Sequence, residues 1–553
     1  MRARLVVRRQ RLVDAAPTHP QLFFTTRSFA SQSKFTSTKA RPSLPFLLVP
    51  RTSSAPVRSF TSERRRWLKH EAKLVARYTI TLWGVAAAVL TILFAVNEEY
   101  VERDFPTPHD WGYLTRKFLR DANGFRDPKS GEVNWARALE LARGVVTRLE
   151  DPKLDGKDVS KLSDTEDPSL EVPAEFNSCD ISAKSEDWRR GYFEAIMLAA
   201  KAAEHVDGWL RDRTRNVVSP PEFVIGPSNP RPKPIAPGNP HAPREEDCEI
   251  AYPSADNFYM KILATKGLSA RQKMDAALEY ASFMEFKGRG DGPEALYNLA
   301  LAEATQGIEP AKLPYNPKTF VVKDRADPPS LNILDALTAI ATHKARQGDL
   351  SSALPIYVSL LKARRSLSDS PPRSTPPKPP RQSIFQQVVS FISPPDYPPP
   401  PPDGTQPPWR SPYERCQEAS LNLYIGEILY ATGSRDDGLA WTRDGVDLSE
   451  EQLRALGSST DRSNKDSRQT CRECLATGLD NWSTMVARLA RAEEAKKSGG
   501  VSSNVFSFWS GSQDAEGRWA AEEAVVQERK RRTKELLEDV APPSASIWTF
   551  IKA

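Results

Sequence analysis

The sequence predicts an all-α protein with a single N-terminal transmembrane helix, followed by an α-helical solenoid of paired helices with Pro-rich disordered insertions. Three observations predict this class. One stretch of nineteen residues without a charge lies near the N-terminus, helical periodicity recurs through the rest of the chain, and alternating strand patterns are nearly absent. The 47 prolines in 553 residues and an apolar share of 39% indicate that part of the chain forms no core.

The N-terminal segment is strongly basic. Residues 1–77 hold 17 Lys and Arg against three acidic residues, whereas the whole chain has a net charge of only +6, so the rest of the chain is acidic. A stretch rich in Arg, Ser and Thr and poor in acids is typical of a mitochondrial presequence. We therefore expect residues 1–62 to be a presequence and a disordered basic arm, with cleavage between Phe29 and Ser62. A basic tail without a targeting role is the alternative.

The candidate membrane span runs over residues 78–96, from Tyr78 to Val96, and includes Trp83 and Gly84. As a helix with a rise of about 1.5 Å per residue it would be about 28 Å long, which is enough for one crossing of the hydrocarbon core. Because no other stretch of the sequence approaches this length and hydropathy, a transporter with several spans is excluded. A buried core helix is the alternative interpretation.

The charges on either side of the span predict its orientation. The segment 63–77 carries six Lys and Arg residues near the span, whereas Glu98, Glu99 and Glu102 follow it. The positive side stays in the compartment where insertion begins, which for a protein with a mitochondrial presequence is the matrix. We therefore expect a protein of the mitochondrial inner membrane, with its N-terminus in the matrix and residues 97–553 in the intermembrane space.

The body after the span reads as helices separated by Pro-rich breaks. We expect helical parts at 97–218, 254–370 and 413–540, Pro-rich insertions at 219–253 and 371–412, and a tail at 541–553. The second insertion contains an apolar island at 384–392. Helical periodicity is strongest in ten stretches: 135–149, 188–210, 270–286, 294–304, 331–347, 351–366, 415–432, 436–446, 468–497 and 515–540.

Several of these stretches follow the tetratricopeptide pattern, in which small and apolar residues at fixed spacing let paired helices approach closely. One unit fits well from residue 337 to residue 361, and a second begins near residue 421. An ordinary helical bundle remains the alternative, since helical hairpins with Gly turns are common. The residues expected to pack the repeats are Leu337, Ile340, Ala341, Gly348, Ala353, Tyr357, Gly426 and Gly433.

The one motif with possible chemistry is Cys471-Arg472-Glu473-Cys474. A C-x-x-C pair in a βαβ unit would indicate redox activity, but here it opens a helix, and no second pair or spaced His completes a zinc site. Two alternatives stay open for Cys471 and Cys474: a disulfide between them in an oxidising compartment, or two small residues that pack the helix. Motifs for phosphate, dinucleotide or hydrolase sites are missing. We expect no catalytic residue, cofactor or metal, and no nucleic-acid partner for an acidic body.

Four segments together resemble a known family: residues 64–71, Trp83-Gly84, 105–111 and 471–482. They are similar to the single-span, tetratricopeptide-containing adaptor subunit of the i-AAA protease supercomplex in the inner membrane of fungal mitochondria. The resemblance implies a non-enzymatic adaptor that binds unfolded inner-membrane or intermembrane-space clients in a groove and delivers them to the protease for quality-control degradation. It also implies that exposed polar residues such as Thr338 and His343 line that groove.

Two other functions remain open. The same groove could hold a stable partner, which would make the protein an assembly or scaffold factor for a respiratory-chain or import complex. Redox activity at Cys471 and Cys474 is the third hypothesis. Partner identity distinguishes the first two, because an adaptor binds one protease strongly and many clients weakly, whereas an assembly factor binds one or two folded subunits.

Overall fold

The computed structural model describes residues 62–127, 133–161, 177–234, 242–288, 290, 292–324, 327–371, 397–457, 462–499 and 517–538. The chain divides into two units, one that ends at Ala88 and one that begins at Val89. In the described residues nearly all regular structure is helical, with two small sheets. The predicted mostly helical class is therefore confirmed.

Helix α1, Ser62–Asp104, contains the whole predicted span without interruption. It is long and apolar enough to cross a membrane, with a mean hydropathy of 2.2 over its most apolar window and none of that window buried. Tyr78, Trp83 and Val96 are exposed. A Cβ added at Gly84 would meet no atom within 4 Å. Among the described residues, α1 is the one helix with these properties.

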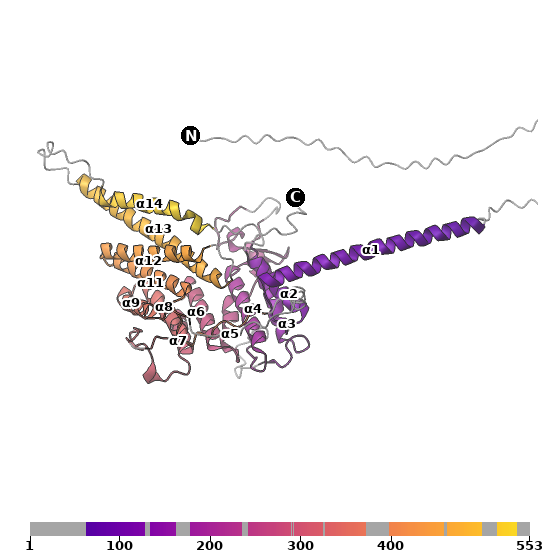
Figure 1. Cartoon of the computed structure of the whole chain (residues 1–553), viewed down its shortest axis with the longest axis horizontal. Helices are drawn as coiled ribbons and strands as arrows, with labels where there is room; N and C mark the ends of the chain where they lie inside the picture. The colour runs from indigo at the N-terminus through magenta and orange to yellow at the C-terminus, as the bar shows by residue number, and fades with distance from the viewer. Residues whose placement is uncertain are drawn as a thin grey trace, which may run out of the picture. The chain divides into compact units, whose positions relative to one another are not determined.

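The helices of the second unit follow one another in space as they do along the chain, each contacting the next (Figure 1). Several also contact the helix after next, as α4 does α6 and α11 does α13. The bounds are α2 Tyr113–Arg126, α3 Trp135–Glu150, α4 Glu186–His205, α5 Ala255–Ala264, α6 Ala270–Phe286, α7 Gly292–Ala304, α8 Leu331–Arg346, α9 Leu350–Arg365, α11 Pro412–Ala431, α12 Arg435–Leu456, α13 Arg462–Gly499 and α14 Arg518–Leu537.

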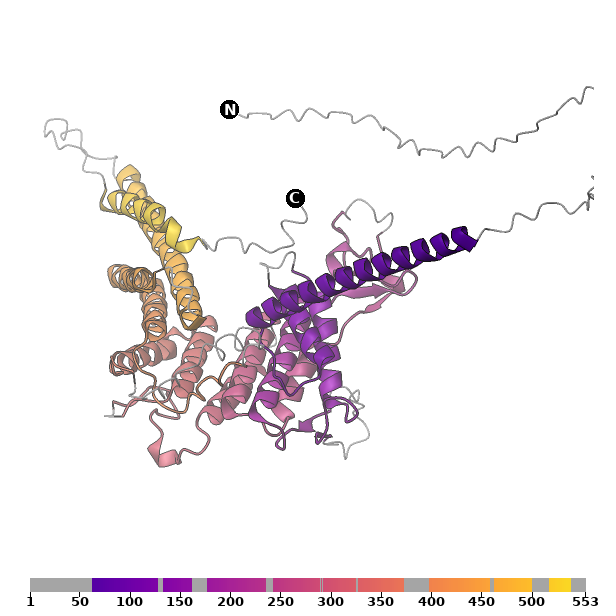
Figure 2. The ribbon, with the colours of Figure 1, turned by 45° about the vertical axis from the view of Figure 1, so that its right-hand side comes forward.

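Local sequence explains where these helices begin and how closely they pack. Ser269 and Gln272 form a reciprocal capping box at the start of α6, and Ser185 caps α4 by accepting a hydrogen bond from the Trp188 backbone N–H. Along α4, six residues of the buried face are Ala or Gly, which lets α3 and α5 approach closely. Figure 2 shows the last two helices, α13 and α14, side by side.

The residues predicted to pack the repeats lie in or beside the core between α6 and α11. Leu337, Ile340 and Ala341 of α8 and Ala353 and Tyr357 of α9 are all buried. The turns after α8 and α11 use two glycines with positive φ, Gly348 at +87° and Gly433 at +106°. Gly426 allows α11 and α12 to touch, because a Cβ there would lie 2.8 Å from the Gly438 carbonyl oxygen.

The first Pro-rich segment is folded where the structure describes it. Three short antiparallel strands form a sheet in the order β4-β3-β5, with bounds β3 Leu210–Asp212, β4 Val217–Ser219 and β5 Cys248–Ile250. A second pair joins β1 Ser160–Lys161 to β2 Cys179–Asp180. Within 219–253 the prediction of a disordered insertion is wrong for the described residues around Ile225 and β5, because β5 pairs with β3 and the Ile225 N–H donates to the Pro243 carbonyl.

The second Pro-rich segment also packs where it is described. We call residues 397–411 the strap. Arg190 of α4 donates hydrogen bonds to the Tyr397 hydroxyl at 3.1 Å and to the Pro398 carbonyl at 2.7 Å. Further along, the Gly404 and Gln406 carbonyls accept from the first backbone N–H groups of α8. The prediction of a disordered insertion is therefore wrong for the strap. The apolar island at 384–392 lies outside the described residues.

Candidate functional site

A groove with a cavity volume of about 770 Å³ lies along the helices of the second unit. Its walls come chiefly from α4, α6, α8 and α11, the first helices of successive pairs, with additions from α2 and α7. The lining residues are Asn123, Arg126, Phe193, Glu194, Met197, Leu198, Lys201, Arg271, Asp275, Leu278, Glu279, Ser282, Tyr297, Asp335, Thr338, Ala339, Thr342, Arg346, Tyr413 and Gln417.

The groove combines apolar surface with hydrogen-bonding groups. Phe193, Met197, Leu278 and Tyr413 are half-buried, so each keeps part of its apolar surface accessible. Between them lie amide and hydroxyl side chains, among them the exposed Ser282. A surface of this kind can bind a polypeptide through apolar contacts while the polar groups bind its backbone.

The charges of the groove largely neutralise one another. Lys201 pairs with Glu279 across α4 and α6 at 2.8 Å. Arg271 of α6 contacts Asp275 at 3.1 Å and Asp335 of α8 at 2.9 Å. Four basic and four acidic residues line the cavity in total. The groove therefore has no net charge with which to select strongly acidic or strongly basic ligands.

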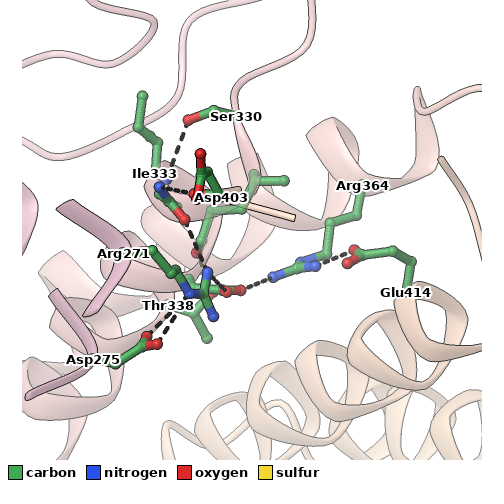
Figure 3. A network of polar contacts seen from close by, with 11 residues as sticks. Arg271, Asp275, Ser330, Ile333, Thr338, Arg364, Asp403 and Glu414 are labelled. Carbon is green, nitrogen blue, oxygen red and sulfur yellow. Dashed lines mark hydrogen bonds and ion pairs between the residues drawn. The ribbon is translucent and has the colours of Figure 1, made fainter. Parts of the chain in front are cut away.

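A buried ion network supports the end of the groove where α6, α8, α9 and α11 meet (Figure 3). Asp335 bridges two cations, Arg271 and the almost fully buried Arg364 of α9, the latter at 3.2 Å. Arg364 also contacts Glu414 of α11. Burial lowers the pKa of the Arg364 guanidinium, but the charges of Glu414 and Asp335 outweigh burial and raise it above its ordinary value. The network thus connects three groove helices, α6, α8 and α11, through Asp335 and Arg364.

The two residues expected in the groove differ in position. Thr338 lines the cavity, and its hydroxyl donates to the Leu334 carbonyl at 2.7 Å. His343 is 5% exposed and does not line it, so the expectation of an exposed His343 is wrong. Five residues along a helix turn the side chain by about 140°, which places the His343 ring between Glu285 and Tyr297.

The disulfide of this protein is not the Cys471–Cys474 link that the C-x-x-C motif suggests. Cys471 of α13 forms a disulfide with Cys416 of α11, with a Cα–Cα distance of 5.0 Å. Cys474 is a buried free thiol that donates to the Cys416 carbonyl at 3.5 Å. Burial raises the pKa of Cys474 to about 11, so this thiol is protonated at neutral pH and a poor nucleophile. The described residues hold no group of His, Cys, Asp and Glu arranged to bind a metal.

Sequence reasoning missed the contribution of the strap to this site. Tyr397 lies against Arg190, whose guanidinium is 3.9 Å from the ring centroid, one helical turn before the groove residue Glu194. The strap therefore borders the groove at α4 and reaches the N-terminus of α8. The Pro-rich composition gave no signal of this, because the contacts combine one aromatic side chain, Tyr397, with backbone carbonyls, and neither follows a repeating pattern.

Comparison of the chain with protein families, with curated proteins and with solved structures finds no match.

Proposed function

We propose that this protein is a non-enzymatic adaptor of the mitochondrial inner membrane. Its tetratricopeptide-like helices bind extended segments of non-native client proteins in the groove, on the intermembrane-space side. The adaptor then delivers these clients to the i-AAA protease complex for degradation. The observation that carries the proposal is the groove lined by the first helices of successive helix pairs. In helical repeat proteins this concave surface is where peptides and protein segments bind.

The chemistry of the groove supports a client without a fixed sequence. Its basic and acidic residues are equal in number, and Lys201–Glu279 and Arg271–Asp335 pair with each other, so affinity depends on apolar contacts and on hydrogen bonds to the client backbone. Non-native membrane proteins expose both of these features. Binding at Phe193, Met197 and Leu278 would bury apolar surface worth about 25 cal/mol per Å² before the cost of ordering the client.

Two further observations support the location of the body. Helix α1 has the length and hydropathy needed for one span, and the Lys and Arg residues lie on its N-terminal side. The Cys416–Cys471 disulfide is typical of an oxidising compartment, which the intermembrane space is and the matrix is not. Both observations favour a body that faces the intermembrane space.

Affinity purification of the C-terminally tagged full-length protein from detergent-solubilised mitochondria tests the proposal. We expect near-stoichiometric recovery of an inner-membrane AAA protease together with many clients at low abundance. Ser282→Arg places a long charged side chain in the groove and should reduce the clients while leaving the protease bound. Leu299→Arg adds the same charge at an exposed position of α7 outside the groove and should change neither.

Two outcomes would contradict the adaptor function. Recovery of a respiratory-chain or import complex without the protease would replace it with the assembly or scaffold function. Equal client recovery with wild type and Ser282→Arg would show that clients do not bind in the groove. A measurement of folding by circular dichroism on both Arg variants separates loss of binding from loss of structure.

A further inference from the structure

A second cavity, distinct from the groove, lies between the connection that precedes α8 and the start of α9. Its volume is about 520 Å³. Three Lys residues line it, and none of the described residues that line it is acidic. The remaining lining residues are Asn316, Thr319, Phe320, Val321, Val322, Ser351, Ser352 and Pro355. Because the body as a whole is acidic, a cavity lined by Lys residues without acidic neighbours in its lining indicates a negatively charged ligand.

The three ammonium groups come from two parts of the fold. Lys318 and Lys323 lie on the connection, and Lys344 lies on α8. Lys323 donates one hydrogen bond to the Leu313 carbonyl at 3.2 Å, so its ammonium keeps two further N–H donors. Lys318 is exposed, and within the described residues it forms no ion pair with an acidic side chain.

The connection that carries two of these Lys residues is well ordered by its own backbone. Tyr315 and Val322 form a bridge, and the Phe320 N–H donates to the Asn316 carbonyl at 2.7 Å. Phe320 has a φ of +58°, a conformation that an aromatic residue adopts only when its surroundings hold it. This turn places the Phe320 ring beside Lys344, 5.8 Å from the ammonium to the ring centroid.

Among the described residues, the acidic group in contact with this cationic cluster is Asp349, the N-cap of α9. Its carboxylate accepts hydrogen bonds from the Ser351 hydroxyl at 2.9 Å and the Ser352 N–H at 3.2 Å, and lies 4.0 Å from Lys344. The lining itself carries three ammonium groups and no carboxylate, so with Asp349 beside Lys344 the site keeps an excess of positive charge. That balance matches a phosphate monoester, which is close to a dianion at neutral pH because its second pKa is about 6.

We propose that this cavity binds an organic phosphate. Lys318, Lys323 and Lys344 hold the phosphate oxygens, with the Thr319 hydroxyl as a further donor. Phe320, Val321 and Pro355 form an apolar wall that takes the organic part of the ligand. The phosphate belongs either to a free metabolite or to a phospholipid headgroup, which are the same chemistry at this site. This inference does not depend on the adaptor function or on the groove.

Titration calorimetry on the full-length protein in phosphatidylcholine nanodiscs tests the soluble source, with phenyl phosphate as the probe. We expect binding that is tighter than that of inorganic phosphate, because inorganic phosphate lacks the ring that meets Phe320. The variant Lys318→Gln/Lys323→Gln/Lys344→Gln should bind phenyl phosphate about tenfold more weakly or worse, which corresponds to about 1.4 kcal/mol or more. Lys318→Gln alone changes an exposed residue and should weaken binding severalfold without affecting folding.

The matched control is Lys312→Gln. Lys312 lies on the same connection, pairs with Glu309 at 3.2 Å, and does not line the cavity, so its replacement should leave the affinity unchanged. The lipid source is tested by native mass spectrometry of protein released from nanodiscs that also contain phosphatidic acid. Retention of phosphatidic acid by wild type but not by the triple variant, without phenyl phosphate binding, would assign the site to a headgroup. Binding of neither ligand, or equal binding by the triple variant, would overturn the proposal.

Discussion

The backbone N–H of Asn332, near the start of α8, donates a hydrogen bond to the carbonyl oxygen of Gly404 in the strap at 3.1 Å. The Asn332 side-chain amide also donates to the neighbouring Asp403 carbonyl at 2.9 Å. A helix begins with four N–H groups that lack partners within the helix, and the strap supplies two acceptors to α8 through Gly404 and Gln406. The Pro-rich segment thus completes the capping of a groove helix.

Replacing Gly404 should loosen this contact. Gly404 has a φ of +67°, and a Cβ there would lie 2.0 Å from the Asn332 side-chain oxygen. We expect Gly404→Ala to lower the free energy of unfolding by about 2–3 kcal/mol and to increase hydrogen exchange at the start of α8. Gly208→Ala is the control, because Gly208 has a φ of +75° with no atom within 4 Å of the added Cβ. Equal losses in both variants would show that backbone strain alone, without the strap contact, accounts for the effect.

Arg364 should contribute strongly to stability because it compensates buried carboxylates. Arg364→Met removes the partner of Glu414, which is 2% exposed, and one of the two partners of Asp335. We expect a loss of about 3–5 kcal/mol in urea unfolding. The double variant Arg364→Met/Glu414→Leu should recover part of that loss, since no charge is then buried at position 414. A double variant less stable than the single one would contradict this account.

The start of the body should be sensitive to acid through Glu102. Burial raises the pKa of this carboxyl, but hydrogen bonds from Arg116 and Thr107 and the charges of Arg116 and Arg120 outweigh burial, so its pKa lies below its ordinary value. A carboxyl with a lowered folded pKa contributes stability above its unfolded pKa of about 4.3, and this contribution is lost as the pH falls through the folded value.

Hydrogen exchange of α2 at pH 7 and at decreasing pH measures this contribution. Wild type should lose protection of α2 below about pH 4.3, as Glu102 becomes protonated. Glu102→Gln should show weaker protection already at neutral pH, by about 3 kcal/mol, and a flatter pH dependence. Glu140→Gln, which removes an exposed pair with Arg137, serves as the control and should behave as wild type. The same pH profile in Glu102→Gln and wild type would exclude Glu102 as the titrating group.

The cysteine arrangement predicts which thiols react. Without reductant, maleimide labelling of the native protein should modify the half-buried Cys248 and spare the buried Cys179 and Cys474. In denaturant three cysteines should react, and after reduction all five. Mass spectrometry of the peptides should find Cys416 linked to Cys471. A Cys471–Cys474 link, or five reactive thiols without reductant, would contradict the pairing.

Helix periodicity predicted most of the fold because one face of each long helix is buried. The α6 bounds, Ala270–Phe286, agree with the prediction at both ends, since Ser269 and Gln272 mark the start of the helix. Helices α2 and α5 were not predicted. The first is amphipathic, but its Asn123-Gly124 pair is typical of a turn, and the second has only ten residues, too few for a clear period. Their helical form depends on contacts with α3, α4 and α6.

The site was less predictable than the fold. Thr338 lines the groove as expected, but the place of His343 depends on the exact rotation of α8 against α6 and α7. Two features depend on contacts between residues far apart in the chain, which no local pattern reports. Cys416 lies 55 residues before Cys471, and the strap contacts Arg190 about 200 residues away. The Pro-rich composition predicted disorder because few of its side chains can pack a core. The composition does not show that carbonyl groups of the strap accept hydrogen bonds from α8.

The most direct test of the central claim, that the groove binds client segments, is site-specific photocrosslinking in intact mitochondria. A photoreactive phenylalanine derivative replaces Ser282 in the groove or, as the control, Leu299 on the exposed surface of α7. We predict that the probe at Ser282 crosslinks many inner-membrane and intermembrane-space proteins, more of them after heat stress, and that the probe at Leu299 crosslinks few. The same crosslinks from both positions, or none from Ser282 under stress, would contradict the account.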